Sequence, residues 1–197
     1  MANIKTGNWK QDLVLQGKAF QATVGSLSTP IVGGGNGTVI DLDQSELRIA
    51  VPSGTAIIPL RIRVDIATPL LASDGNEVEI LIAVDRTQAI TDGTDTLETP
   101  INMRTDNQIS SLCTVNSATT ADHTDPVLGM ELHHPLLTAD SQTAVGVMWG
   151  QLFADYDPTA SPVIVGPATL LVYWGGTVAT SGFCSAEWAE LASGDVI

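Results

Sequence analysis

The sequence predicts an all-β protein, built as a two-sheet β-sandwich or jelly roll, and three observations support this class. Apolar residues alternate with polar ones over residues 59–85, as in strands with one buried face. Threonine outnumbers lysine by 22 to 3, and branched Cβ atoms suit strands better than helices. Short apolar segments also recur between turns rich in Gly, Pro, Asn and Asp, as in sandwiches.

Residues 1–18 are predicted to form an extended amino-terminal arm, and residues 19–197 a single β-sandwich domain. A chain of 197 residues buries about 70% of its unfolded surface, so one core is enough to hold it together. Besides the alternating segment, strands are expected at residues 19–27, 38–42, 46–51, 109–115, 127–134, 143–156, 163–174 and 177–180.

The alternating segment is predicted to be a β-hairpin with its turn at residues 74–76, which read Asp-Gly-Asn. Side chains on the polar face of one strand meet those of the other, so Arg63 is expected to face Glu77 or Glu79. The buried face of the first strand is formed by Leu60, Ile62, Val64 and Ile66.

Two later segments carry signals of irregularity. The apolar segment 163–174 is interrupted by Gly166 and Pro167, which predicts a buried strand with a kink or bulge. Residues 184–194 fit either a short C-terminal helix, capped by Ser185, or a final strand.

Charge is distributed unevenly along the chain. The net charge is −14, yet residues 1–40 carry +2 and the remainder −16. Nucleic-acid binding is not expected, because it needs clustered Lys or Arg to displace counterions from phosphates. A membrane role is not expected either, since no apolar run reaches the length that crosses a bilayer. The acidic surface serves solubility on one interpretation. On the other, a weakly basic arm docks while the acidic remainder faces solvent.

No residue pattern predicts catalysis, a cofactor or a metal site. The G-x-S-x-G turn that presents a nucleophilic serine is absent. His133 and His134 are adjacent and point to opposite faces of a strand, and His123 is expected in a polar loop. Residues 41–46 imitate the start of a calcium loop but lack its glycine and its final glutamate.

The two cysteines are too few to form a disulfide framework. Cys113 and Cys184 are predicted to be free thiols packed as small hydrophobes, and a single bridge between them is the alternative.

Three stretches resemble the strands and wide Thr-, Gly- and Pro-rich connections of β-sandwich capsid decoration, or cement, proteins of tailed bacteriophages. They are residues 50–69 (AVPSGTAIIPLRIRVDIATP), 143–156 (TAVGVMWGQLFADY) and 166–188 (GPATLLVYWGGTVATSGFCSAEW). The resemblance implies a homotrimer on the outer surface of an icosahedral virion, bound to the major capsid protein by an arm and without enzymatic activity. The proposed docking residues are Lys5, Lys10 and Lys18, which steer, and Trp9, which anchors.

Two other function classes remain open. The fold also serves carbohydrate-binding and receptor-binding modules, for which the expected signal is an exposed aromatic near carboxylates; Tyr156 with Asp155 and Asp157 is the candidate. A small jelly-roll capsid protein is a further alternative. A hydrolase ranks last, because its candidate acid pair, Asp155 and Asp157, is expected at the end of a strand.

Overall fold

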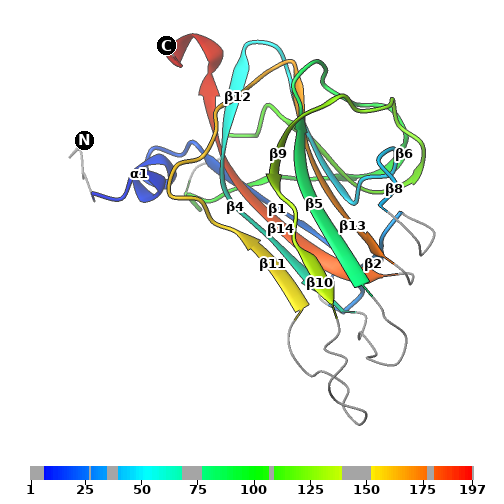
Figure 1. The fold of residues 1–197 in the computed structure, drawn as a ribbon. Coiled ribbons are helices and arrows are strands. Elements are labelled where there is room, and N and C mark those ends of the chain that lie inside the picture. Colours follow the sequence, from blue (N-terminus) through cyan, green and yellow to red (C-terminus); the bar gives the residue numbers. More distant parts are fainter. Residues whose placement is uncertain are drawn as a thin grey trace.

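The computed structural model describes residues 7–26, 28–34, 40–67, 77–106, 109–138, 152–176 and 180–196. Over these residues the chain is mostly strand, and two antiparallel sheets pack face to face (Figure 1). The predicted all-β, two-sheet sandwich is therefore confirmed. We call the sheets sheet I and sheet II.

Sheet I contains the first and last long strands of the chain. Its main path runs in the order β11, β4, β14, β1, β7, with β12 paired to β4 and β2 paired to β14. The bounds are β1 (Ala19–Val24), β2 (Ile31–Val32), β4 (Thr55–Ile66), β7 (Ile101–Asn102), β11 (Leu152–Tyr156), β12 (Ile164–Val165) and β14 (Ser181–Ala192).

Sheet II faces it across the core. Its path runs in the order β10, β5, β13, β3, β8, β6, with β9 paired to β5. The bounds are β3 (Leu47–Val51), β5 (Glu77–Asp85), β6 (Thr94–Glu98), β8 (Thr114–Ala121), β9 (Leu128–His133), β10 (Leu136–Thr138) and β13 (Ala168–Gly176).

The strand pairs are nested like the two arms of one long hairpin. β1 pairs with β14, β3 with β13, β4 with β11 and β12, and β5 with β9 and β10. Rolling this hairpin up adds two further pairs, β4 with β14 and β5 with β13. The chain therefore crosses between the sheets several times, for example from β3 to β4 to β5 and from β12 to β13 to β14, and apolar side chains from both sheets fill the interior.

The predicted hairpin over residues 59–85 is wrong. Its two segments are strands, but β4 belongs to sheet I and β5 to sheet II. Arg63 does not face Glu77 or Glu79 across a hairpin; it lies opposite Ser185 on one side and Asp155 on the other. The alternation identified each strand correctly, but pairing depends on the whole roll. The predicted turn at residues 74–76 lies outside the described residues.

A β-bulge in β4 changes which side chains share a face. The register with β14 shifts between Glu187 and Trp188, which leaves Leu60 as the extra residue of β4. Ile62 packs in the interior of the sandwich, whereas Leu60 packs on the outside of sheet I with Ala19. The expectation that Leu60 shares a buried face with Ile62 is therefore wrong, because one extra residue reverses the alternation.

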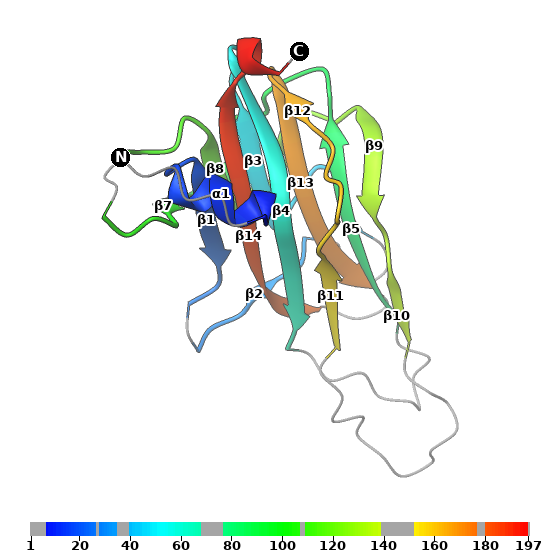
Figure 2. The same cartoon turned by 90° about the vertical axis from the view of Figure 1, so that its left-hand side faces the viewer.

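The amino-terminal segment is not extended where it is described. Trp9–Leu15 forms helix α1, and the side chain of Asn8 caps it by accepting from the backbone N–H groups of Lys10 and Gln11. Leu13 and Val14 pack against the outside of sheet I, so the helix lies across β1, β14 and β4 (Figure 2).

The other element expectations have mixed outcomes. Residues 181–192 form strand β14, so of the two predicted alternatives for the C-terminal segment the strand is confirmed and the helix is wrong. The single kinked strand predicted over residues 163–174 is wrong: at Gly166–Pro167 the chain leaves sheet I after β12 and enters sheet II as β13. Residues 40–42 are not a strand, and β8 begins only at Thr114.

Both cysteines are buried free thiols, and burial raises the pKa of each above the ordinary thiol value. Residues 143–151 and 177–179 lie outside the described part of the chain.

Candidate binding face on sheet I

The outer face of sheet I divides into two halves. Helix α1 covers the upper half, near the chain ends (Figure 2). The lower half carries outward-pointing side chains from β1, β14, β4 and β11, which the strand register arranges in rows. One row contains Phe183, Asp65 and Phe153, and the next contains Thr23, Ser185, Arg63 and Asp155.

Two arginine–carboxylate pairs fix the charged side chains on this open half. Arg61 binds Asp155 with both arms of its guanidinium, with Nε to Oδ1 at 2.9 Å and Nη2 to Oδ2 at 2.6 Å. Arg63 binds Asp65, with Nε to Oδ2 at 2.8 Å and Nη2 to Oδ1 at 2.7 Å. The hydrogen bond from Arg61 holds the pKa of Asp155 below its usual range. Paired in this way, the charges keep defined positions.

The same surface contains two aromatic rings. Phe153 is 43% exposed, and the guanidinium carbon of Arg63 lies 4.5 Å from the centroid of its ring. Phe183 lies two strands away in the same row. Each ring therefore borders a charged residue of β4.

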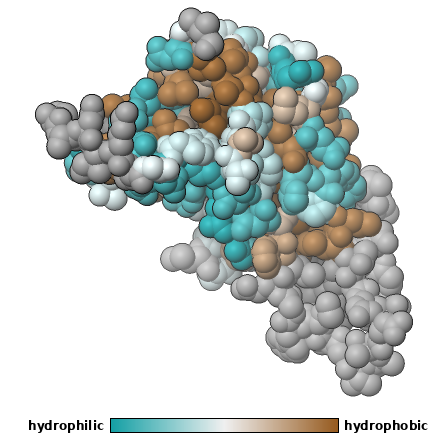
Figure 3. Space-filling model, turned by 60° about the vertical axis from the view of Figure 1, so that its left-hand side comes forward, coloured by the Kyte–Doolittle hydropathy of each residue, from teal (hydrophilic) through white to brown (hydrophobic). Residues whose placement is uncertain are grey.

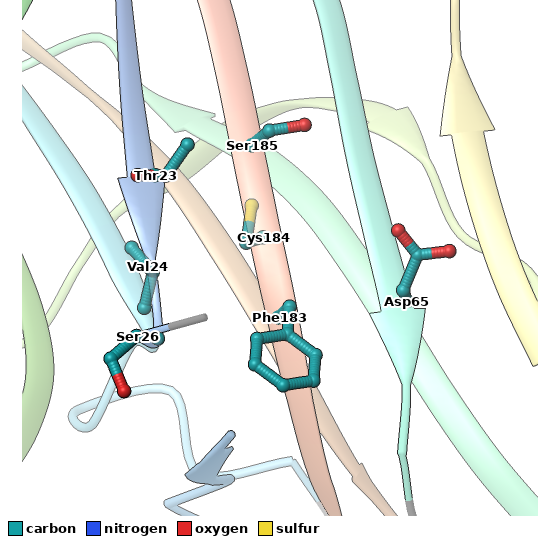
Figure 4. Close-up of a pocket in the computed structure, with 8 residues that line it drawn as sticks. Thr23, Val24, Ser26, Asp65, Phe183, Cys184 and Ser185 are labelled. Atoms are coloured by element: carbon teal, nitrogen blue, oxygen red, sulfur yellow. The ribbon is translucent and has the colours of Figure 1, made fainter. Parts of the chain in front are cut away.

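Phe183 lines a depression in this face (Figure 4). The depression has a volume of about 550 Å³ and is lined from β1, β14 and β4. In Figure 4 the ring is seen face-on, with the carboxylate of Asp65 on one side, Ser26 on the other, and Thr23 and Ser185 above it. An apolar platform with oxygen-bearing side chains around it can hold a ligand that has both apolar and hydroxyl surface.

Sequence reasoning missed both phenylalanines, although β14 carries a usable signal. The residues of β14 that alternate with Phe183 and face the interior are small or apolar, such as Cys184 and Ala186. Phe183 instead points to the same outer side of β14 as Ser185 and Glu187. A large aromatic residue in the polar phase of an alternating strand is therefore the signal that could have identified this face.

The predicted aromatic and carboxylate cluster is split by the fold. Asp155 lies on the open face with Arg61, while Tyr156 packs against the core and its ring lies 6.2 Å from that of His133. Asp157 is paired with Lys10 on helix α1. These three residues do not form one site, because Tyr156 points to the face of β11 opposite to Asp155 and Asp157 lies beyond the end of the strand.

The four proposed docking residues have different environments. Lys10 donates from Nζ to the carbonyl of Leu60, at 2.6 Å, and forms an ion pair with Asp157, so it holds the helix to the bulge in β4. Trp9 is 39% exposed and lines a shallow pocket with Pro158. Lys18 is half-buried and its carbonyl accepts from Glu190 N–H. Lys5 lies outside the described residues.

Exposed apolar side chains lie around helix α1, in what we call the helix-bearing half. Figure 3 shows apolar atoms gathered over the upper part of this side of the molecule, with hydrophilic atoms below them. Ile101 is the register partner of Gln21 at the edge of sheet I, and the N–H of Leu112 donates to Glu190 of β14. The residues, between 39% and 69% exposed, are Trp9, Ile101, Leu112, Val163 and Val165.

The outer face of sheet II is covered by loops and holds buried polar residues. Asp85 accepts hydrogen bonds from Thr87, Gln88 and Val127, which belong to two loops over the sheet. Burial alone would raise the pKa of Asp85, but these hydrogen bonds lower it below its usual value. The acid therefore serves to anchor the loops.

The histidines also have structural partners. His123 lies in a loop, as expected, but it is buried, with Nε2 3.4 Å from Ser45 Oγ and Nδ1 2.9 Å from the carbonyl oxygen of Thr124. Nε2 of His134 lies 2.5 Å from a carboxylate oxygen of Glu79.

Within the described ranges, no three His, Cys, Asp or Glu side chains come together so that they could hold a metal ion. No helix in the same ranges has the length and apolar character needed to span a membrane. Comparison with protein-family models, curated proteins and solved structures found no match to this chain.

Proposed function

We propose that this chain is a virion structural protein, a decoration protein that stands on the outside of an icosahedral capsid as a homotrimer and stabilises it. It binds the major capsid protein and has no enzymatic activity. In this role the chain works by removing apolar surface from water where subunits meet, at about 25 cal/mol per Å². Many identical contacts on a symmetric shell then add up.

The nested order of strand pairs is the observation that carries this proposal. The first strand pairs with the last, and each further pair lies inside the one before it. This is the arrangement of a rolled-up hairpin, or jelly roll. Jelly rolls recur in viral capsid domains and in lectins. Because one fold serves many functions, the choice between these two classes depends on the surface.

The helix-bearing half supports a role in docking. A large apolar side chain left in water forgoes roughly 1.5–3 kcal/mol relative to burial, and this half exposes several of them around Trp9. The net charge of −14 favours a capsid surface that is neutral or basic where it meets this half.

The prediction that lysines of the amino-terminal arm steer docking changes in one respect. Lys10 is already neutralised by Asp157, so we assign attachment to apolar contacts around Trp9 and not to steering by lysines. Deleting residues 1–18 would also remove Leu13 and Val14 from the outside of sheet I and destabilise the sandwich. Point substitutions on the exposed surface are therefore the sharper test.

The test uses virus particles from the source of the chain. Electron microscopy with an antibody against the chain is expected to label the outside of particles, and sedimentation of the purified chain is expected to give a trimer. Labelling confined to non-particulate material, or a shell built from this chain alone, would contradict a decoration role.

A pair of matched variants locates the attachment surface. Trp9→Ala combined with Val165→Ser is expected to reduce rebinding to stripped particles at least about tenfold, since each removes roughly a kcal/mol or more of apolar contact. Val32→Ser is the control, because Val32 is 62% exposed and pairs with the opposite end of β14. Equal loss in the control would show that attachment lies elsewhere.

A further inference from the structure

The depression on the open half of sheet I has the form of an aromatic platform. The side chain of Phe183 lies half-buried on the outer side of sheet I, and oxygen-bearing side chains from three strands lie around it (Figure 4). The apolar ring offers dispersion contacts to a flat C–H surface, while the groups at its edge offer hydrogen bonds. A ligand that fits has one apolar face and hydroxyls around its rim.

Gly25 allows the ring to take this position. A Cβ at Gly25 would lie 2.7 Å from Cδ1 of Phe183, closer than nonbonded atoms approach, and Gly25 has a φ of +89°. Glycine is the residue that adopts this backbone conformation without strain and leaves room for the ring. The turn after β1 therefore leaves space for the ring of Phe183.

The carboxylate beside the ring is held in place by a chain of contacts across two strands. Phe153 lies under the guanidinium of Arg63, and Arg63 binds Asp65 through Nε and Nη2. Asp65 is therefore positioned before any ligand arrives, which lowers the entropy lost on binding. Its oxygens retain lone pairs that can accept from a hydroxyl.

We propose that this platform binds neutral hexopyranosides. The C–H face of the sugar ring stacks on Phe183, and its hydroxyls bond to Asp65 and to the hydroxyl groups of Thr23 and Ser185. The net charge of −14 disfavours sulfated or sialylated glycans, which are anionic. The platform lies outside the helix-bearing half, so sugar binding and capsid attachment use different surfaces and fail independently.

The test is binding of the full chain to a glycan array, followed by calorimetry with methyl hexopyranosides and the neutral oligosaccharides that score on the array. Saturable binding of at least one neutral glycan is expected. Absence of binding up to about 10 mM sugar, or a preference for anionic glycans, would overturn the proposal.

Substitutions connect the binding to the platform. Phe183→Ala is expected to weaken affinity at least about tenfold, whereas Phe183→Tyr keeps a ring and retains binding. Asp65→Asn, which leaves the ring in place, is expected to weaken affinity by about the same factor. Trp9→Ala removes an exposed aromatic outside the depression and is expected to leave the affinity for the sugar unchanged, although it weakens capsid attachment. Undiminished binding by both Phe183→Ala and Asp65→Asn would overturn the assignment, with thermal unfolding confirming that each variant is folded.

Discussion

The outer faces of the two sheets differ in what lies over them. Sheet II is covered by loops of its own chain, which leave Arg48 and Asp85 with no exposed surface. On sheet I, helix α1 covers one half, and the other half leaves Thr23 and Phe153 exposed. The hydrogen-bond partners differ accordingly. Asp85 on sheet II binds backbone and side-chain groups of the covering loops, whereas the charged groups on sheet I bind each other, within β4 or between β4 and β11.

This comparison separates residues that maintain the fold from residues that are available to a ligand. A buried polar group must keep its partners, because an unpaired group cannot turn to water. An exposed ion pair loses little when it is broken, since water replaces the partner. Substitutions on the two faces should therefore have very different effects on stability, and this is a direct way to test the comparison.

The largest effect is expected at Asp85 on the covered face. Asp85→Ala leaves the N–H groups of Thr87 and Val127 without their acceptor, which should lower the free energy of unfolding by about 3–5 kcal/mol. Urea unfolding followed by fluorescence measures the change. A loss below about 1 kcal/mol would show that the loops are held by other contacts and that the covered face is not closed as described.

A pH-dependent effect is expected from Glu46, a second buried acid. Its carboxylate accepts from the N–H groups of Gly34, at 2.5 Å, and Trp174, at 2.8 Å, yet burial raises its pKa to about 8. The folded state then binds a proton that the unfolded state releases near pH 4.5. The free energy of unfolding should therefore fall as pH rises from about 5 to 8, by up to about 1.4 kcal/mol per pH unit.

The variant Glu46→Gln isolates this contribution, because an amide does not titrate. The difference in unfolding free energy between the protein and the variant should change with pH in this window and be constant above it. A difference that stays constant from pH 5 to 8 would mean that Glu46 is ionised throughout and that its two N–H donors outweigh burial.

The smallest effect is expected at Asp155 on the open face. Asp155→Ala breaks the pair with Arg61, in which the side chains are 26% and 41% exposed, and should cost less than about 1 kcal/mol. Most of that cost should disappear in 1 M salt, which screens exposed charges. A loss as large as that of Asp85→Ala would show that the open face carries fold-maintaining residues as well.

The fold was predictable in its class and in most of its strands, but not in its pairing. Alternation in β4 and β5 shows that each has a buried side, and this follows from local geometry. Whether β4 pairs with β5 or with β14 depends on side chains more than one hundred residues away in the chain. The bulge at Leu60 could not be predicted from the sequence either, since an extra residue in an apolar strand leaves the sequence pattern nearly unchanged.

The candidate binding face was predictable only in part. Asp155 was singled out, but its expected partners Tyr156 and Asp157 were assigned from closeness in sequence. The residues that surround the depression come from three strands, and only the sheet register brings Thr23 and Asp65 beside Phe183. Trp9 was recognised as unusual because an indole in a polar segment is noticeable without any structure.

The sequence by itself determined that this chain forms a β-sandwich with an acidic surface, because side-chain shape, alternation and charge act over a few residues. The tertiary structure decided how the strands nest, where Lys10 binds, and that Phe183 faces outward beside Asp65. Those outcomes depend on contacts between distant segments, and a contact between distant segments leaves no signal in either segment alone.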